Sequence, residues 1–399
     1  MHLVRALLVA AALIPLSCGA GDPASPGSGT PIHITSGYPQ RGVVHGASFL
    51  SWDSETIAEA ARGKIMIAPI EFYFAPAAED IISELKSLNP DIRLLGYQLV
   101  MGVPTLWADT SGIAGQPSYK REYFEAVVDD WAYTTTGDTL MLWPDLIFLN
   151  PIRSDAVNRT LIAELVGLIE KYQSLSGGVI DGMMHDYFMD GPYLSPYVKE
   201  HVSGEIDLDG DGAVFVDDST ERDLLIAYQK EYASEIRRRL GDDFIQVGNG
   251  LLPHTDGELA SILNGIFYED FPQCRIGLTD RDGLQRLLAH HVKGYLAEAR
   301  GRTWSIVTNE RGLGNNMFCL VASMMAGCLY TELHGENLFT GWTLNVWGGD
   351  PRGGIIREGH ADSLLTFRRE FRYGEARMSF LPSGRRSEVV FESAIGFGE

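Results

Sequence analysis

Residues 64–100 have the sequence KIMIAPIEFYFAPAAEDIISELKSLNPDIRLLGYQLV. The two apolar runs at 64–70 and 92–100 are short, which is typical of buried strands. Between them, residues 77–88 place aliphatic side chains on one face at helical spacing, and the pattern stops before Pro90. A strand, a helix and a second strand in this order predict an α/β fold.

The same alternation continues along the chain. The strands are expected at residues 43–49, 64–70, 92–100, 177–184, 243–248, 265–268, 303–307 and 328–333. The helices are expected at residues 77–88, 154–172, 221–240, 284–299 and 315–327. Eight strands with intervening helices predict a (β/α)8 TIM barrel. A doubly wound open sheet would give a similar alternation, but no GxGxxG or P-loop motif stands at a strand–helix turn, which argues against nucleotide binding.

Four parts make up the expected domain organisation. They are an export signal or lipobox at residues 1–18, a flexible linker at 19–38, the barrel at 39–368 and a C-terminal β-hairpin packed on the barrel at 369–399. The apolar run after Arg5 is too short to span a bilayer, and the residues around Cys18 resemble the end of a bacterial lipobox. The chain is therefore expected outside the cytoplasm, either secreted after cleavage near Ala20 or lipid-anchored through Cys18. Residues 102–150, rich in Tyr, Trp and Thr, interrupt the alternation and are expected to cover the mouth of the cleft.

The composition excludes several classes of protein. The chain has 399 residues, of which 45% are hydrophobic, so it can bury a large core. Lys and Arg number 32 against 53 Asp and Glu, and the net charge of 32 − 53 = −21 argues against nucleic acid and anionic lipid as partners. We expect a monomer that meets the membrane only through a lipid on Cys18. With Cys274, Cys319 and Cys328 in the body and no CxxC spacing, the sequence argues against a zinc site and allows at most one disulfide there.

Acidic residues recur where the predicted strands end. Asp186, Glu269, Glu310 and Glu332 each follow or end a different strand. In a TIM barrel the carboxyl ends of the strands carry the chemistry, and two carboxyls with aromatic side chains nearby suit cleavage of a glycosidic bond. Such acids also cap helices or pair with Arg, so a barrel that binds glycans without cleaving them is an alternative. Metal-dependent hydrolysis is a third hypothesis, without a His–acid ligand spacing in its favour.

Short motifs in a fixed order carry a family resemblance. They are Leu85-Lys86 with Asn89-Pro90, Leu95-Gly96-Tyr97, Leu149-Asn150-Pro151, Asp181-Gly182 with Asp186, Gly265 with Tyr268-Glu269-Asp270-Phe271, Gly349-Asp350-Pro351-Arg352-Gly353, and Arg369-Glu370-Phe371 with Gly374. In these motifs the chain resembles the extracellular TIM-barrel glycoside hydrolases related to endo-α-1,4-polygalactosaminidase. The resemblance implies hydrolysis of an α-linked polysaccharide, with Asp186 and Glu269 as the catalytic pair. The residues expected to contact the substrate are Tyr97, Asp181, His185, Tyr187, Asn249, Tyr268, Glu310, Glu332 and Trp342.

Residues 207–218 carry the sharpest local motif. Acids stand at positions 1, 3, 5 and 12 of an EF-hand-type loop, with a glycine at position 6 for the sharp turn. The expected ligands, in loop order, are Asp207, Asp209, Asp211, the carbonyl of Ala213 and Asp218. Because Ca²⁺ prefers clustered oxygens, we expect a structural Ca²⁺ that braces this insertion beside Asp186, and no organic cofactor. An acidic, solvated loop without an ion is the alternative.

Overall fold

The computed structural model describes residues 40–44, 52–74, 78–108, 119–192, 204–215, 218–250, 252–269, 304–309, 319–324, 327–332, 356–358, 365–371, 374–380 and 387–389. They belong to two compact units. Unit 1 comprises Met1–Gly96, Tyr268–Leu296 and Trp304–Glu399, and unit 2 comprises Tyr97–Phe267 and Ala297–Thr303. None of the helices within the described ranges has both the length and the apolar character that a bilayer crossing requires.

Unit 1 contains a parallel sheet with the strand order β2-β1-β11-β10. Its strands are β1 (Gln40–Val44), β2 (Gly63–Pro69), β10 (Trp304–Asn309) and β11 (Leu329–Glu332). The first half of the unit adds α2 (Ser54–Ala60), the 3₁₀-helix η2 (Ile70–Phe74) and α3 (Ala78–Leu88). Asn89, directly after α3, donates from Nδ2 to the carbonyls of Ala61 (2.9 Å) and Gly63 (2.8 Å), which ties the end of α3 to the start of β2. The parallel pairing and α3 confirm the predicted α/β arrangement.

An antiparallel sheet follows near the end of the chain. Its strands, paired in sequence order, are β12 (Ile356–Glu358), β13 (Leu365–Phe371), β14 (Gly374–Phe380) and β15 (Ser387–Val389). Arg368 on β13 pairs with Glu358 (2.8 Å) and Glu375 (3.0 Å) on the two neighbouring strands. The antiparallel pairing already begins at Ile356, ahead of the hairpin expected from Arg369 onward.

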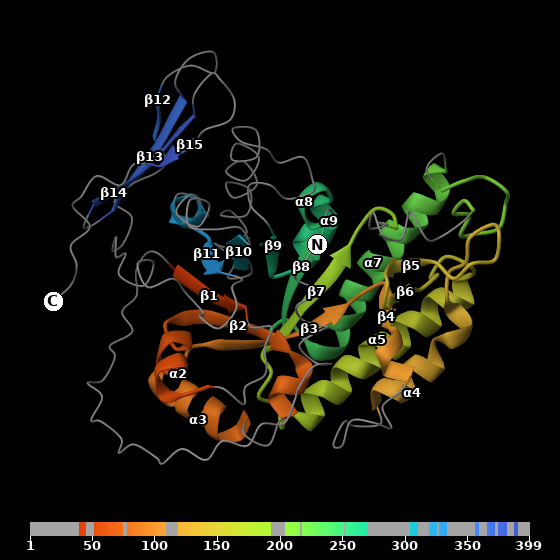
Figure 1. Ribbon diagram of the computed structural model, residues 1–399, viewed down its shortest axis with the longest axis horizontal. Helices are drawn as coiled ribbons and strands as arrows, with labels where there is room; N and C mark the ends of the chain where they lie inside the picture. Colours follow the sequence, from red (N-terminus) through yellow and green to blue (C-terminus); the bar gives the residue numbers. More distant parts are fainter. Residues whose placement is uncertain are drawn as a thin grey trace. The chain divides into compact units, whose positions relative to one another are not determined.

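Unit 2 contains the parallel strands β7 (Gly182–Phe188), β8 (Ile245–Gly250) and, as far as Phe267, β9 (Gly265–Tyr268), paired in that order. β3 (Arg93–Leu99) enters this unit at Tyr97, and the next residue after β3, Val100, donates its N–H to the carbonyl of Asp186 on β7 (3.0 Å). The helices are α5 (Asp155–Leu175), α7 (Ser219–Leu240), α8 (Leu252–Thr255) and α9 (Gly257–Ile262). In Figure 1, α5 and α7 lie side by side.

β7 begins later than the sequence predicts. A strand was expected at 177–184, whereas β7 spans Gly182–Phe188. Gly177 and Gly178 have φ angles of 63° and 78°, in the left-handed region that glycine tolerates and a strand does not use. These two residues turn the chain after α5, so the strand starts only after the turn is complete. The shift places Asp181 before the strand and Asp186 near its carboxyl end.

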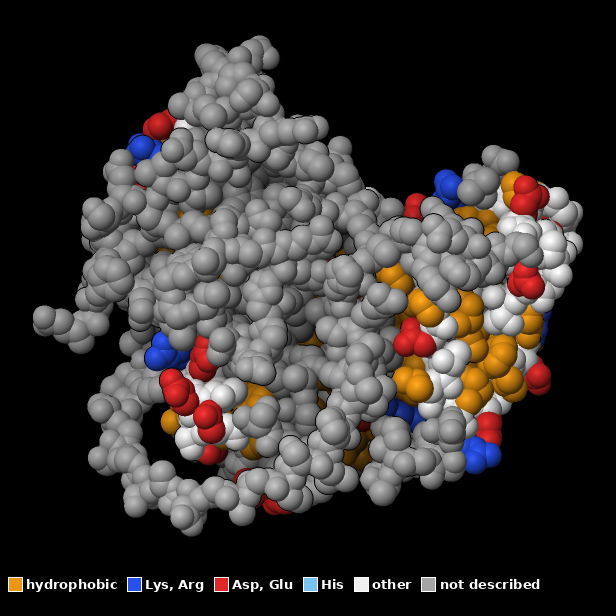
Figure 2. All heavy atoms as spheres, in the orientation of Figure 1, with side chains coloured by type: hydrophobic (Ala, Val, Ile, Leu, Met, Phe, Trp, Pro, Cys, Tyr) orange, Lys and Arg blue, Asp and Glu red, His pale blue; other side chains and the backbone are white. Residues whose placement is uncertain are grey.

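The segment 102–150 forms a small antiparallel sheet of its own. Its strands are β4 (Gly102–Pro104), β6 (Leu146–Phe148) and β5 (Met141–Trp143), in that spatial order, with α4 (Tyr119–Ala126) and the 3₁₀-helices η3 (Thr105–Ala108) and η4 (Val128–Asp130) between β4 and β5. Strands of three residues are too short to show an alternating pattern, so these strands could not be predicted from the sequence. Leu106 and Tyr133 are 48% and 45% exposed. Figure 2 shows hydrophobic atoms at the surface over this segment.

Candidate functional site

The carboxylate of Asp186 accepts hydrogen bonds from three donors. The Tyr97 hydroxyl donates to Oδ2 (2.5 Å), and Oδ1 accepts from Asn249 Nδ2 (2.9 Å) and from the backbone N–H of Tyr187 (2.7 Å). Asp186 and Asn249 are only 7% and 4% exposed. Because donors on both oxygens satisfy the ionised form of a carboxyl, Asp186 is suited to carry a negative charge. The structure thus brings together three of the residues that the sequence proposed for a site.

The strands of unit 2 explain how this cluster forms. Tyr97, Asp186 and Asn249 each stand near the carboxyl end of a strand, in β3, β7 and β8. The register between β7 and β8 shifts between His185 and Phe188, and Tyr187 within this bulge has a φ of 74°. A non-glycine residue in this region costs about 1–2 kcal/mol, and such strain concentrates at functional sites. The bulge and the strained backbone of Tyr187 therefore indicate that the Asp186 end of β7 belongs to a functional site.

Gly250 on β8 lies opposite this bulge. Its φ is 126°, and a Cβ added there would lie 2.3 Å from the carbonyl oxygen of Phe188. Only glycine therefore permits β8 to approach β7 at this level. The close approach also fixes the preceding residue, Asn249, whose amide holds Asp186.

His185 points away from the Asp186 carboxylate, toward α7. Its ring is fully buried, its Nδ1 lies 3.0 Å from the hydroxyl oxygen of Tyr232, and its ring contacts the rings of Tyr232 and Phe188. Neighbouring residues of a strand face opposite sides, so the side of β7 that presents Asp186 cannot also present His185. The predicted contact between His185 and substrate does not fit this position, because the imidazole is packed under a helix. Burial, and secondarily the charge of Arg237, lowers the pKa of His185 to about 3.

The depressed pKa of His185 makes stability depend on pH. The unfolded chain takes up a proton on this side chain below about pH 6.5, whereas the folded chain keeps the imidazole neutral until about pH 3. The stability that the neutral His185 contributes is therefore complete above about pH 6.5 and is lost at about 1.4 kcal/mol per pH unit as the pH falls toward 3.

His185→Asn should remove this dependence while keeping an acceptor near Tyr232. We expect the variant to be less stable at pH 7, and its deficit relative to the wild type to shrink as the pH falls from 6.5 to 4.5. Urea unfolding at a series of pH values measures the difference in unfolding free energy between the two proteins. The other titrating groups contribute equally to both proteins, so their contributions cancel. Parallel stability curves for the two proteins would show that His185 does not titrate on unfolding.

Gln229 on α7 is a positioning residue that the sequence did not single out. It is fully buried, and its carboxamide accepts from the backbone N–H of Met189 (2.9 Å) and donates to the carbonyl of the same residue (2.7 Å). These two bonds fix the chain three residues beyond Asp186. The available signal was a polar side chain between the apolar residues Leu225 and Tyr232 on the inward face of the 221–240 helix.

The remaining predicted site residues have mixed outcomes. Asp181 precedes β7, at the opposite end of the strand from Asp186, and its carbonyl accepts from Ile245 N–H (2.9 Å). Because β7 starts at residue 182, Asp181 does not lie at the carboxyl end of the strand, where the sequence placed it. Tyr187 and Tyr268 are 8% and 1% exposed. Glu269 stands directly after β9 and is half-buried. Glu332 ends β11, and Glu310 and Trp342 lie outside the described residues.

The acidic loop before α7 forms two overlapping carboxylate groups. Asp207, Asp209 and Glu221 each offer an oxygen within 4.8 Å of the others, and so do Asp209, Asp211 and Asp218. The loop is internally hydrogen-bonded, since Asp207 accepts from the N–H groups of residues 210 (2.8 Å) and 212 (3.0 Å). Such geometry can hold a hard cation such as Ca²⁺.

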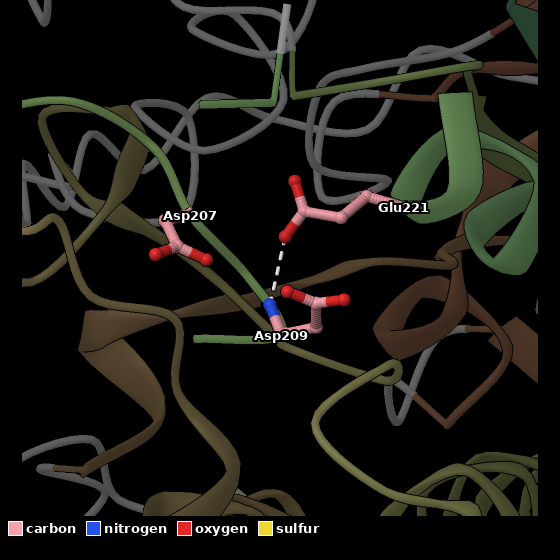
Figure 3. A group of neighbouring side chains, drawn as sticks. All are labelled: Asp207, Asp209 and Glu221. Carbon is pink, nitrogen blue, oxygen red and sulfur yellow. Dashed lines mark hydrogen bonds between the residues drawn. The ribbon is translucent and has the colours of Figure 1, made fainter. Parts of the chain in front are cut away.

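Two predicted ligands of this loop have other engagements. Asp218 Oδ1 caps α7 by accepting from the N–H groups of Thr220 (2.6 Å) and Glu221 (3.3 Å). Asp211 Oδ1 accepts from the N–H of Ala213 (2.7 Å). Glu221, which the loop count did not include, extends from the first turn of α7 toward Asp207 and Asp209 (Figure 3). Burial raises the pKa of Glu221. In the sequence, Glu221 could have been noticed as an acid three residues after Asp218, the residue that caps α7.

No protein-family model and no curated protein matches the chain. Among solved structures it is similar to the glycoside hydrolase domain of PelA from Pseudomonas aeruginosa, with 11% identity and a TM-score of 0.39 over 74% of this chain and 94% of that chain. The PgaB (BpsB) glycoside hydrolase domain from Bordetella bronchiseptica is 11% identical, with a TM-score of 0.40 over 71% of this chain and 87% of that chain. The noncanonic maltogenic α-amylase AmyB from Thermotoga neapolitana is 10% identical, with a TM-score of 0.39 over 82% of this chain and 79% of that chain. At such low scores and identities these likenesses carry no conclusion about the chemistry of this chain.

Proposed function

We propose that the chain is a glycoside hydrolase in which Asp186 acts as the ionised carboxylate and Glu269 as the proton-donating carboxyl. Cleavage of an O-glycosidic bond needs one carboxyl that protonates the leaving oxygen and a second that serves as base or nucleophile. The observation that carries the proposal is the carboxylate of Asp186, held by Tyr97, Asn249 and a backbone N–H at the carboxyl end of β7. A carboxylate held in this way is ready for the second of the two roles.

Glu269 is proposed for the acid role because of its place in the sequence. It directly follows β9, the strand that pairs with β8, and it is half-buried. A proton donor must exchange its proton with solvent after each turnover, which partial exposure permits. The resemblance to polygalactosaminidase-related proteins supports the same pair and an α-linked polysaccharide as substrate.

We also infer the fold, the substrate contacts and the location of the enzyme. We place the two carboxyls in an eight-stranded (β/α)8 barrel, whose strands would be parallel like those of the sheets β2-β1-β11-β10 and β7-β8-β9. The substrate would also contact Tyr187, Tyr268, Glu310, Glu332 and Trp342. The enzyme would act as a monomer outside the cytoplasm, secreted or anchored through Cys18. A Ca²⁺ ion on the loop that contains Asp207 would stabilise it.

Release of reducing ends from polysaccharides tests this function. The purified chain should degrade at least one member of a panel of α-linked neutral and amino-sugar polymers, and Glu269→Gln should remove that activity while the circular dichroism spectrum stays unchanged. Full activity of Glu269→Gln would overturn the assigned acid. A folded wild-type chain that retains a panel polymer on a column without cutting it would overturn hydrolysis.

A glycan-binding protein without hydrolysis is the second candidate. The low exposure of Asp186 favours it, because a buried carboxylate can also serve as a fixed acceptor for one sugar hydroxyl. This candidate predicts polymer retention with no new reducing ends in any buffer. It also predicts that Asp186→Asn weakens retention, whereas the hydrolase proposal predicts that the same variant still binds polymer and loses turnover.

A further inference from the structure

The carboxylate of Glu221 is buried with one of its oxygens unsatisfied. The residue is 0% exposed, and its Oε1 accepts from the backbone N–H groups of Leu208 and Asp209, the latter at 2.7 Å. Its Oε2 has no hydrogen-bond partner among the described residues. A buried carboxylate oxygen without a donor is costly, so native proteins normally supply a proton donor or a cation.

No cationic side chain of the described residues pairs with Glu221. In the part of the chain that the structure describes, no Lys or Arg forms an ion pair with Glu221 or with any acid of the 207–218 loop. Instead, oxygens of Asp207 and Asp209 lie within 4.8 Å of a Glu221 oxygen. Figure 3 shows the three carboxylates grouped around the same short stretch of backbone. Like charges at this spacing repel one another unless a cation lies among them.

We propose that Glu221 is a Ca²⁺ ligand that closes this loop from the first turn of α7, together with Asp207 and Asp209. The inference deepens the proposed Ca²⁺ site and rests on it. Sequence spacing predicts Asp218 as the closing acid, but Asp218 groups with Asp209 and Asp211, whereas Glu221 groups with Asp207 and Asp209. Glutamate is one methylene longer than aspartate, which lets Glu221 reach back from the helix to the loop. All the groups are hard oxygens, the ligand type that Ca²⁺ prefers.

Ion binding at Glu221 would join three segments of unit 2. The loop already contacts the 102–150 segment, because Asn150 Nδ2 donates to the carbonyl of Leu208 (2.7 Å). Glu221 belongs to α7, whose Gln229 holds the chain after Asp186. A cation between loop and helix would therefore stabilise the insertion that follows β7, and its effect should appear first as thermal stability.

Calcium titration of the full chain tests the inference. Wild type, Glu221→Gln and Glu231→Gln are freed of metal with EDTA, then titrated with CaCl₂ by calorimetry and melted with EDTA or with excess Ca²⁺. Glu231 is an exposed acid on the same helix, so its variant makes the same charge change away from the loop. We expect Ca²⁺ to raise the Tm of wild type and Glu231→Gln by several degrees. Glu221→Gln should bind Ca²⁺ at least about tenfold more weakly and lose this rise.

The melts in EDTA separate a ligand from a merely structural residue. The glutamine oxygen can still accept from Leu208 and Asp209, and the substitution removes a buried charge. Without Ca²⁺, Glu221→Gln should therefore melt at or above the temperature of the wild type. An equal loss of Tm with and without Ca²⁺, or an unchanged Kd, would overturn the role of Glu221. Absence of binding by the wild type would overturn the Ca²⁺ site itself, and none of these outcomes depends on polysaccharide hydrolysis.

Discussion

Asp186→Asn should lower kcat for polysaccharide hydrolysis by about 10³-fold, because it removes the charge and basicity that the proposed base or nucleophile supplies. The fold should survive the change. The Asn oxygen can still accept from Asn249 Nδ2 and Tyr187 N–H, and the new amide can donate to the Tyr97 hydroxyl oxygen. Reducing-end release and a thermal melt, measured on the same preparation, check both halves of this prediction.

Asp181→Asn is the matched control for Asp186→Asn. It makes the same chemical change on the residue just before β7, at the opposite end of the strand from Asp186. We expect Asp181→Asn to keep kcat within about threefold of the wild type, because Asp181 is remote from the carboxyl end where the strands of α/β barrels carry chemistry. Equal losses in both variants would mean that the effect comes through β7 itself. Full turnover by Asp186→Asn would remove Asp186 from the mechanism.

Long periodic elements could be predicted from the sequence, and local backbone geometry could not. The helix predicted at 77–88 is α3, and the helix predicted at 221–240 is α7 with two more residues at its start, because several turns of apolar spacing specify a face. β7 was misplaced because its neighbouring Gly177 and Gly178 adopt left-handed angles that a strand-like run of letters does not reveal. The three-residue strands of the 102–150 segment were missed for lack of length.

Only part of the candidate site could be predicted from the sequence. Asp186 and Asn249 could be named because they come near the ends of strands, where parallel neighbours must converge. The prediction for His185 was wrong because neighbouring residues of a strand face opposite sides, so His185 and Asp186 cannot share one face. The β-bulge between His185 and Phe188, in contrast, could not be predicted from the sequence. Glu221 was missed because the EF-hand-type motif covers only residues 207–218. The first turn of α7 brings the Glu221 side chain to the loop from outside that range.

Arg237→Met should lower the free energy of unfolding by about 3 kcal/mol, because it removes five hydrogen bonds, three of them to partly buried acceptors. The guanidinium stands near the end of α7, and its side chain is 18% exposed. Its acceptors are the carbonyl oxygens of Gly241 (3.0 Å), Asp242 (2.9 Å), Phe244 (2.8 Å) and Ile262 (3.1 Å) and the Oδ1 of Asn264. Urea unfolding at pH 7 measures the loss.

The arrangement around Arg237 also explains why Lys should not replace it. Five acceptors spread around one planar group match the fork of a guanidinium, whereas an ammonium offers three donors at a single point. We therefore expect Arg237→Lys to recover less than half of the lost stability.

Arg238→Met is the control, since Arg238 is 70% exposed and contacts Glu235 on the same helix, so its removal should leave the unfolding midpoint nearly unchanged. Asn264 also accepts from Gln246 N–H (2.8 Å), so Arg237 helps to set the register of β8, the strand that carries Asn249 to Asp186. Equal midpoints for Arg237→Met and Arg238→Met would show that the interactions of Arg237 add no stability beyond that of an exposed ion pair.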